Sequence, residues 1–302
     1  MSLVLETNSL TKKYRGTIVV DHVSMRLEKG DIYGLIGRNG AGKTTIMRML
    51  GGIARPTSGT YEFFGEKDNK KTIKRIGCLI ESPSLYTDMS VVNNLKFYNK
   101  LLGITDNSNI EEILELVELT DAKKKTARKL SLGMKQRLGI AIALIGNPDI
   151  LILDEPVNGL DPTGIVEIRN LLLKLNQERG VTILISSHIL GELQRLATRY
   201  GIIDKGVLVE EISHEELLEK TRQAIQIDAQ DAKAVAVVLE EMELRNYKIL
   251  PDQKVQVFCD TSLSGNINAT LASKGIYAES IRVVGQDLEA YFVEKMGGAD
   301  HE

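Results

Sequence analysis

Residues 37–44, Gly37-Arg38-Asn39-Gly40-Ala41-Gly42-Lys43-Thr44, fit the pattern G-x-x-x-x-G-K-[ST] of a phosphate-binding loop. The apolar stretch 31–36 before them fits a buried strand, and residues 45–50 after them fit a helix. A loop between a strand and a helix turns its backbone N–H groups and the positive end of the helix dipole toward a polyphosphate. A glycine-rich turn that binds nothing is the alternative, but it does not explain why both flanks match. The stretch therefore predicts that the chain binds a nucleoside triphosphate.

The side chains at the end of this loop predict how the nucleotide is held. Lys43 is expected to reach the β- and γ-phosphates, and the Thr44 hydroxyl to take one position on Mg²⁺. We expect ATP to contact Gly37, Arg38, Asn39, Gly40, Ala41, Gly42, Lys43, Thr44 and Thr45.

A second motif, residues 150–155, is an apolar strand that ends in two carboxylates, the Walker B pattern. Asp154 at the end of the strand is expected to hold Mg²⁺, and Glu155 to polarise a water for attack on the γ-phosphate. Two acids at a strand end are often only a solvated loop. In a chain that also carries a phosphate loop, the catalytic interpretation is favoured.

Length and composition limit the remaining possibilities. A chain of 302 residues accommodates one large domain and a small one. The net charge of −3 gives no indication of a nucleic-acid binder, and two distant cysteines indicate reduced thiols. Residues 1–6 do not resemble a signal peptide, and no stretch approaches ~18 consecutive apolar residues. We therefore expect a cytoplasmic protein that reaches a membrane only by docking to something already there.

The pattern of apolar residues predicts two domains. Residues 1 to about 30 alternate as in an antiparallel β layer, and later strands alternate with helices as in an α/β core. Residues from about 85 to 145 are helical throughout and predict an inserted helical subdomain. We expect the first domain to cover residues 1–220. Residues 221–302 then predict a small α+β domain with the β-α-β-β-α-β order of a ferredoxin-like unit, followed by a last helix.

A third motif identifies a family. Residues 130–137, Leu130-Ser131-Leu132-Gly133-Met134-Lys135-Gln136-Arg137, lie between the other two motifs and open a helix with Ser131 as a natural N-cap. This stretch resembles the signature of ATP-binding-cassette (ABC) ATPases. Residues 158–162 then look like the D-loop, His188 looks like the switch histidine, and Tyr14 looks like the aromatic that stacks on adenine.

The resemblance implies a P-loop cassette whose nucleotides are sandwiched in a head-to-tail dimer, with ATP and Mg²⁺ as cofactors. Ser131 and the N–H of Gly133 would then contact the γ-phosphate held by the partner's Lys43, and Asp161 of the D-loop would lie beside it. His188 would help to place the attacking water, so Glu155 and His188 would be the catalytic pair. A second ATPase subunit, most simply another copy, and separate membrane permease subunits are the implied partners, with the chain peripheral on the inner face of the cell membrane.

Two departures from the family pattern point to one group within the ABC ATPases. Glu81 stands where a glutamine usually touches Mg²⁺ and the attacking water, and Leu132 and Met134 stand where glycine and glutamine are common. Glu81 can still ligate Mg²⁺ through its carboxylate. Together with the C-terminal helix, these features resemble ATPase subunits of bacitracin and lantibiotic exporters.

Three other functions stay open at this point. The first is an ABC importer ATPase. The second is a soluble ABC ATPase that acts on ribosomes or DNA, although the chain has neither two cassettes nor a long coiled-coil insertion. The third is a regulatory binder that does not hydrolyse ATP, which the presence of Glu155 and His188 disfavours.

Overall fold

The computed structural model describes residues 2–67, 72–285 and 288–297. The chain forms two compact units. The first comprises residues 1–214 and the segment from residue 295 onward, and the second comprises residues 215–294. The sequence placed the division after residue 220, whereas the structure divides the chain after residue 214 and returns it to the first unit near its end.

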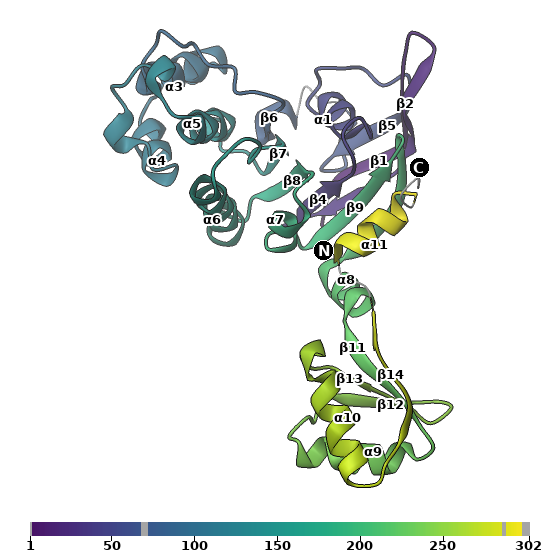
Figure 1. The fold of residues 1–302 in the computed structure, drawn as a ribbon. Coiled ribbons are helices and arrows are strands. Elements are labelled where there is room, and N and C mark those ends of the chain that lie inside the picture. The colour runs from purple at the N-terminus through teal and green to yellow at the C-terminus, as the bar shows by residue number, and fades with distance from the viewer. Residues whose placement is uncertain (1, 68–71, 286–287, 298–302) are drawn as a thin grey trace. The chain divides into compact units, whose positions relative to one another are not determined.

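A six-stranded sheet in the order β10-β9-β4-β8-β7-β6 organises the first unit (Figure 1). Five of these strands are parallel, and β10 pairs antiparallel with β9. Every residue of β4, β7 and β8 is buried, which explains why these strands are almost continuously apolar in sequence. The strands are β4 (Ile32–Ile36), β6 (Ile76–Leu79), β7 (Ile150–Asp154), β8 (Thr182–Ser187), β9 (Arg199–Asp204) and β10 (Val207–Ser213).

The register of the parallel strands brings their carboxyl ends together. Ile36 pairs with Ser187, and Asp154 pairs with Ser186. The phosphate loop, the two carboxylates and the expected switch histidine follow these residues directly in sequence. The sheet therefore gathers three motifs that lie far apart along the chain at one edge.

An antiparallel layer, predicted from the first 30 residues, packs beside this sheet. β1 is its longest strand and pairs with each of the other three. Fully buried side chains, among them Leu5, Phe63 and Ile46, fill the space between this layer, α1 and the main sheet. Burial of this apolar area is the main stabilising term and fixes the layers around the phosphate loop. The strands are β1 (Leu3–Tyr14), β2 (Thr17–Val23), β3 (Arg26–Glu28) and β5 (Ser58–Phe63).

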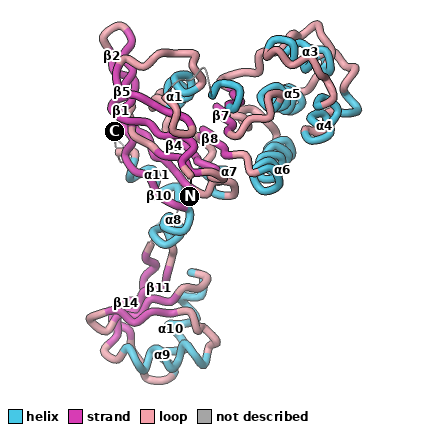
Figure 2. Tube along the Cα trace, turned by 180° about the vertical axis from the view of Figure 1, so that it is seen from behind, coloured by secondary structure: helices cyan, strands magenta, loops and turns pink. Residues whose placement is uncertain are grey.

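The helices of the first unit fall into two groups. α3, α4 and α5 pack on one another and form the helical subdomain, which lies beyond the main sheet (Figures 1 and 2). Ser90 caps α3, and Ser131 caps α5, as predicted for that signature residue. The helices are α1 (Lys43–Leu50), α3 (Val91–Leu101), α4 (Asn109–Leu116), α5 (Leu132–Leu144), α6 (Pro162–Arg179) and α7 (Leu190–Gln194), and α8 (His214–Thr221) leads out of the unit.

The second unit contains the six elements expected from the sequence, in the predicted order β-α-β-β-α-β. Its sheet has the strand order β12-β13-β11-β14, and neighbouring strands are antiparallel. A separate apolar core lies between this sheet and helices α9 and α10. The elements are β11 (Ala224–Ala229), α9 (Ala232–Glu241), β12 (Tyr247–Leu250), β13 (Lys254–Val257), α10 (Ser264–Ser273) and β14 (Ala278–Val284), followed by α11 (Leu288–Lys295). In the described parts of both units, no helix has the length and hydropathy required to span a bilayer.

Candidate functional site

The phosphate loop connects β4 to α1 in a conformation that depends on glycine. Gly40 and Gly42 have φ angles of +83° and +107°, where an L side chain is strained. At Gly42 a Cβ atom would also lie 2.8 Å from the carbonyl oxygen of Val19. Gly42 offers no side-chain cap to α1, so the N–H groups of the first helical turn remain available to phosphate oxygens.

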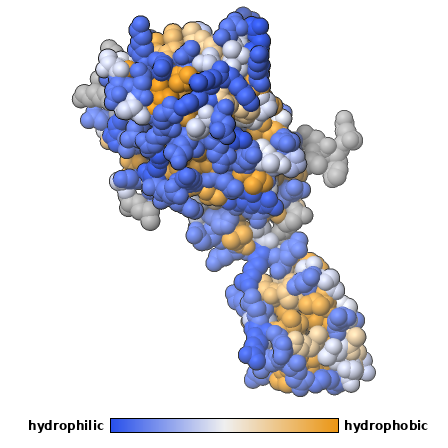
Figure 3. All heavy atoms as spheres, turned by 90° about the vertical axis from the view of Figure 1, so that its left-hand side faces the viewer, coloured by the Kyte–Doolittle hydropathy of each residue, from blue (hydrophilic) through white to orange (hydrophobic). Residues whose placement is uncertain are grey.

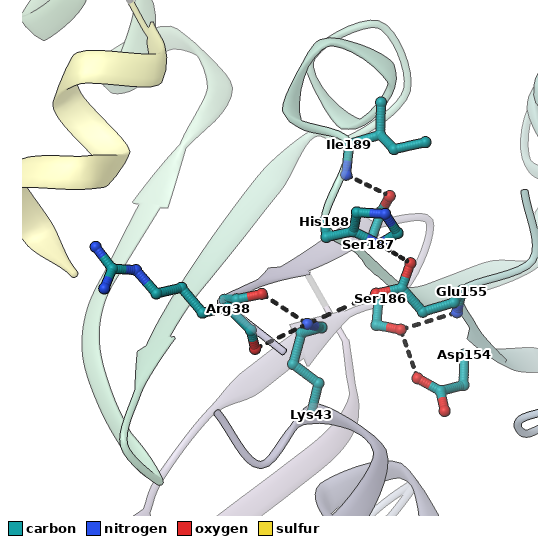
Figure 4. A network of polar contacts seen from close by, with 9 residues as sticks. Arg38, Lys43, Asp154, Glu155, Ser186, Ser187, His188 and Ile189 are labelled. Atoms are coloured by element: carbon teal, nitrogen blue, oxygen red, sulfur yellow. Dashed lines mark hydrogen bonds and ion pairs between the residues drawn. The ribbon is translucent and has the colours of Figure 1, made fainter. Parts of the chain in front are cut away.

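Lys43 is a buried cation at the start of α1, with only 6% of its surface exposed. Its Nζ donates to the carbonyl oxygens of Gly37, at 2.6 Å, and Arg38, at 3.3 Å. It also lies 3.6 Å from Oε1 of Glu155 (Figure 4). The ammonium group is thus held between the loop backbone and the Walker B carboxylate, at the position where a γ-phosphate would compete for it.

One hydroxyl group holds the carboxylate of Asp154 and the backbone of Glu155 at the end of β7. Ser186 on β8 donates its Oγ–H to Oδ1 of Asp154 at 2.6 Å, and the same oxygen accepts the N–H of Glu155 at 2.9 Å (Figure 4). Asp154 is 2% exposed. A buried carboxylate needs such a hydrogen bond, and here it also fixes the direction of the Asp154 side chain.

Glu155 and His188 are paired. Nδ1 of His188 lies 2.7 Å from Oε2 of Glu155, and because a carboxylate only accepts, the histidine N–H is the donor. Glu155 has a φ angle of +49°, which is unusual for a residue with a side chain. Strained backbone that is kept in place by surrounding hydrogen bonds is common at functional sites.

These groups line a single pocket of about 320 Å³. It combines phosphate-loop backbone, a cation, a carboxylate and an imidazole, which suits a polyphosphate and an attacking water. Val19, which was not singled out from the sequence, and Asn158, which was expected only as part of the D-loop, also line it. The lining residues are Val19, Arg38, Asn39, Gly40, Gly42, Lys43, Thr44, Thr45, Glu155, Asn158 and His188.

Three of the predicted site residues, Gly37, Ala41 and Asp154, do not line this pocket. Gly37 packs so closely on β9 that a Cβ atom would lie 2.5 Å from the carbonyl oxygen of Ile203. Ala41 is buried in the core. Asp154 lies below the floor of the pocket, beside Ser186. Ser186 was not predicted, although a serine pair directly before a switch histidine could have indicated it.

Tyr14 and Glu81 lie outside the pocket lining. Tyr14 is 41% exposed at the end of β1, and the ammonium group of Lys12 lies 4.8 Å from the centre of its ring. Glu81 has a φ angle of +67° and forms an ion pair with Arg48 of α1. The structure therefore pairs the carboxylate expected on Mg²⁺ with an arginine instead.

The signature and D-loop residues line a different depression. Ser131, Gly133 and Asp161 lie there together with Leu132, Arg137, Gly159, Leu160, Thr163, Gly164 and Glu167. None of the phosphate-loop residues contributes to it. One chain thus presents its phosphate-loop motif and its signature and D-loop motifs on two separate surfaces.

Comparison with known proteins identifies the family. Residues 20–158 match the domain family described as ABC transporter. The chain is 43% identical to the bacitracin transport ATP-binding protein BcrA of Bacillus licheniformis, and the alignment covers 99% of each chain. It is 44% identical to the lantibiotic transport ATP-binding protein SrtF of Streptococcus pyogenes over 68% of this chain and 89% of that protein.

A solved structure agrees with this assignment. CbiO1 of Clostridium perfringens, described as part of the ABC transporter complex cbiONQ, superposes with a TM-score of 0.65 at 27% identity, covering 73% of this chain and 92% of that one. The relatedness over the full length and the shared cassette fold lead to one conclusion. The chain belongs to the ABC transporter family, as one of its ATP-binding, ATP-hydrolysing subunits.

Proposed function

We propose that two copies of this chain clasp ATP between them, head to tail, and that hydrolysis drives the export of a peptide antibiotic through separate membrane subunits. The observation that carries the proposal is the separation of the two depressions. Lys43, Glu155 and His188 line one, whereas Ser131 and Asp161 line the other. A complete enclosure of the nucleotide then requires a second copy.

The chain's own residues account for the hydrolytic step. Lys43 moves from the loop carbonyls to the β- and γ-phosphates, and the N–H groups at the start of α1 bind phosphate oxygens. Glu155, which lies directly beside Lys43, accepts a proton from the attacking water. His188 donates to Glu155 and orients the carboxylate for this task.

Thr44 and Asp154 have the side-chain oxygens that Mg²⁺ needs. The ion prefers oxygen ligands and keeps several waters, so the Asp154 carboxylate and the Thr44 hydroxyl are a suitable pair of protein ligands. Ser186 holds one oxygen of Asp154 and thereby orients the carboxylate. When bound, Mg²⁺ would neutralise charge on the β- and γ-phosphates. Glu81 would join this set only after leaving Arg48.

A surface of the helical subdomain is suited to the membrane subunit. Tyr86, Phe97 and Tyr98 form an aromatic cluster with ring centres 4.4 to 6.3 Å apart. Leu101 and Leu102, at the end of α3, are 67% and 43% exposed. Figure 3 faces this subdomain and shows apolar surface in the upper part of the molecule. Exposed aromatic and apolar side chains together mark a protein contact.

One buried residue gives this surface its rigidity. Asn94 of α3 is 0% exposed, accepts the N–H of Tyr86 and donates to the carbonyl oxygens of Tyr86 and Ser90. The loop that leads from Glu81 to α3 is therefore tied to the helix. Docking of a membrane subunit here would be transmitted to Glu81 and to the nucleotide pocket.

The names of the relatives support the cargo and the place of action. BcrA and SrtF are described as transport ATP-binding proteins for bacitracin and a lantibiotic. We infer that this chain acts likewise, as a peripheral subunit on the inner face of the cell membrane. Deletion of its gene is expected to lower the concentration of bacitracin or lantibiotic that inhibits growth, and a Lys43→Ala copy is expected not to restore it. Unchanged sensitivity to both compounds would contradict the proposed cargo.

The sandwich itself is tested with Glu155→Gln. This change keeps the shape of the side chain and one acceptor oxygen but removes the base, so ATP should bind and hydrolysis should stop. We expect a stable dimer with ATP and a monomer without it, measured by light scattering during size-exclusion chromatography. Glu178→Gln, on an exposed turn of α6, is the matched control and should hydrolyse ATP normally. A Glu155→Gln chain that stays monomeric with saturating ATP would refute the sandwich.

A further inference from the structure

The signature and the D-loop each lie at the N-terminus of a helix. Oγ of Ser131 accepts the N–H of Met134 at 3.3 Å and caps α5. Oδ1 of Asp161 accepts the N–H of Gly164 at 3.1 Å and caps α6. The residues expected to meet the partner's nucleotide are thus also the residues that define where the two helices begin. Any shift of α5 against α6 would move Ser131 relative to Asp161.

The tips of the two segments contact each other through apolar atoms. A Cβ atom on Gly159 would lie 3.2 Å from Cδ2 of Leu132, and one on Gly133 would lie 3.8 Å from Cδ2 of Leu160. Leu132, which stands where the family usually has glycine, therefore fills the space beside the D-loop. This contact resists separation of the tips, but apolar packing alone does not fix their register.

Arg137 links α5 to α6 by directional hydrogen bonds, about one and a half helical turns after the Ser131 cap. Its Nη2 donates to Oε2 of Glu167 on α6 at 2.5 Å, and its Nη1 donates to Oε2 of Glu118, which follows α4, at 3.0 Å. Arg137 and Glu167 each lie six positions after their cap, 137 after 131 and 167 after 161. The bridge therefore joins equivalent points of the two helices.

The side chain of Arg137 holds two carboxylates in different surroundings, since Glu167 is 38% exposed and Glu118 is 73% exposed. Arg137 itself is 14% exposed, so solvent screens its pair with Glu167 less than it screens a fully exposed one. A guanidinium group can bind two carboxylates in a fixed planar arrangement, which an ammonium group cannot do. Its Nε is buried and has no hydrogen-bond partner among the described residues, so the two carboxylates alone hold the group.

We propose that Arg137 is a positioning residue which, through Glu167 and Glu118, locks the signature and the D-loop into one rigid surface, so that Ser131 and Asp161 engage the partner's ATP together. The proposal rests on the proposed sandwich. Arg137 lines the same depression, six positions after the Ser131 cap, and acts through the two caps. Without it, α5 and α6 are free to close on the nucleotide one after the other, and the ordering of the second segment costs binding free energy.

The test measures dimer formation of the full-length Glu155→Gln chain as ATP is varied. Arg137→Lys keeps the charge but loses the planar, forked arrangement of donors, and Glu167→Gln weakens the link from the other side. Arg179→Lys is the matched control, because Arg179 also joins α6 to the helical subdomain, through Glu112 of α4, but at the far end of the helix. Binding of a fluorescent ATP analogue to the monomer and thermal unfolding are recorded for every variant.

Arg137→Lys and Glu167→Gln are expected to raise the ATP concentration for half-maximal dimerisation, within the roughly 5- to 150-fold range of ordinary site-to-site coupling. Because the two changes break one link, their combination should cost less than the sum of both. Analogue binding to the monomer should be unchanged, and Arg179→Lys should behave like the parent. An equal effect of Arg179→Lys, or no effect of Arg137→Lys, would overturn the proposal. Failure of the parent to dimerise would instead overturn the sandwich, and this inference with it.

Discussion

Glycine at position 42 satisfies two physical requirements at once, whereas glycine at position 40 satisfies one. Both residues have positive φ angles, but only at Gly42 would a Cβ atom meet backbone, the carbonyl oxygen of Val19. Around Gly40 the space is open. The two positions of one loop therefore separate the cost of backbone strain from the cost of a steric clash.

We expect Gly40→Ala to cost about 1–2 kcal/mol, the penalty of left-handed backbone for a residue with a side chain. Gly42→Ala should cost more and abolish ATP binding, because the loop must move to relieve the clash. Binding of a fluorescent ATP analogue and thermal unfolding measure the two effects. A Gly42→Ala chain that binds ATP as well as Gly40→Ala does would show that the loop is not fixed by Val19.

At the scale of residues, the sequence predicted the groups that act locally and missed the groups that act through tertiary contacts. Lys43, Asp154 and Glu155 are recognisable because each follows a buried strand at a fixed spacing. The pairing of Glu81 with Arg48 joins positions 33 residues apart, and the bond from Ser186 to Asp154 joins positions 32 apart. No local pattern encodes such pairs, so the expected place of Glu81 on Mg²⁺ has no support from this geometry.

At the scale of elements, strand β6 forms one edge of the main sheet and packs closely against helix α5. A Cβ atom on Gly77 would lie 2.3 Å from the carbonyl oxygen of Ala143, so α5 covers this strand closely. Burial raises the pKa of the neighbouring Cys78 thiol to about 12. The pKa of Cys259, after β13, is also raised, by burial and by Asp260, although this thiol lies on a loop.

Iodoacetamide at pH 8 is expected to alkylate Cys259 much faster than Cys78. Only the thiolate reacts, and Cys78 stays protonated at this pH. Because the folded pKa of Cys78 lies above the unfolded one, its contribution to stability is present below the ordinary thiol range and is lost as the pH rises above it. Mass spectrometry of digested samples gives both rates. Equal rates would mean that β6 opens readily, whereas labelling in urea should abolish the difference.

The elements predicted with the strongest periodicity are present, and the missed ones are short or mixed in character. The six elements of the second unit and the apolar strands β4, β7 and β8 follow from alternation and apolar runs. β5 (Ser58–Phe63) and β10 (Val207–Ser213) are largely exposed and carry polar residues, so they lack a clear pattern. They are strands because β1 and β9 offer them a partner, which is a tertiary effect.

At the scale of the whole molecule, the two units have separate cores and only the first carries the nucleotide pocket. We expect two transitions in thermal unfolding of the Glu155→Gln chain. ATP at about 100 times its Kd should stabilise the first unit by at least about 2.7 kcal/mol, because it binds the folded form only and the dimerisation that it causes adds to this value. That corresponds to a rise of roughly 5–10 °C for a unit of this size.

Differential scanning calorimetry measures the two unfolding transitions and the shift of the first one with ATP. Lys43→Ala is the control that should show no shift with ATP. A single transition that moves as a whole with ATP would contradict the independence of the two cores. The division between the units was only approximately predictable from sequence, because α8 runs across it without a break in composition.

The ammonium group between the loop carbonyls and Glu155 imposes an order of events on each turnover. As long as Lys43 neighbours the carboxylate, Oε1 of Glu155 faces the ammonium group at 3.6 Å and not an attacking water. An incoming triphosphate draws the lysine away and leaves this oxygen free for the water at the moment when there is a bond to cleave. Binding of ATP thus frees the carboxylate that acts in its hydrolysis, and a subunit without ATP keeps that carboxylate beside a lysine.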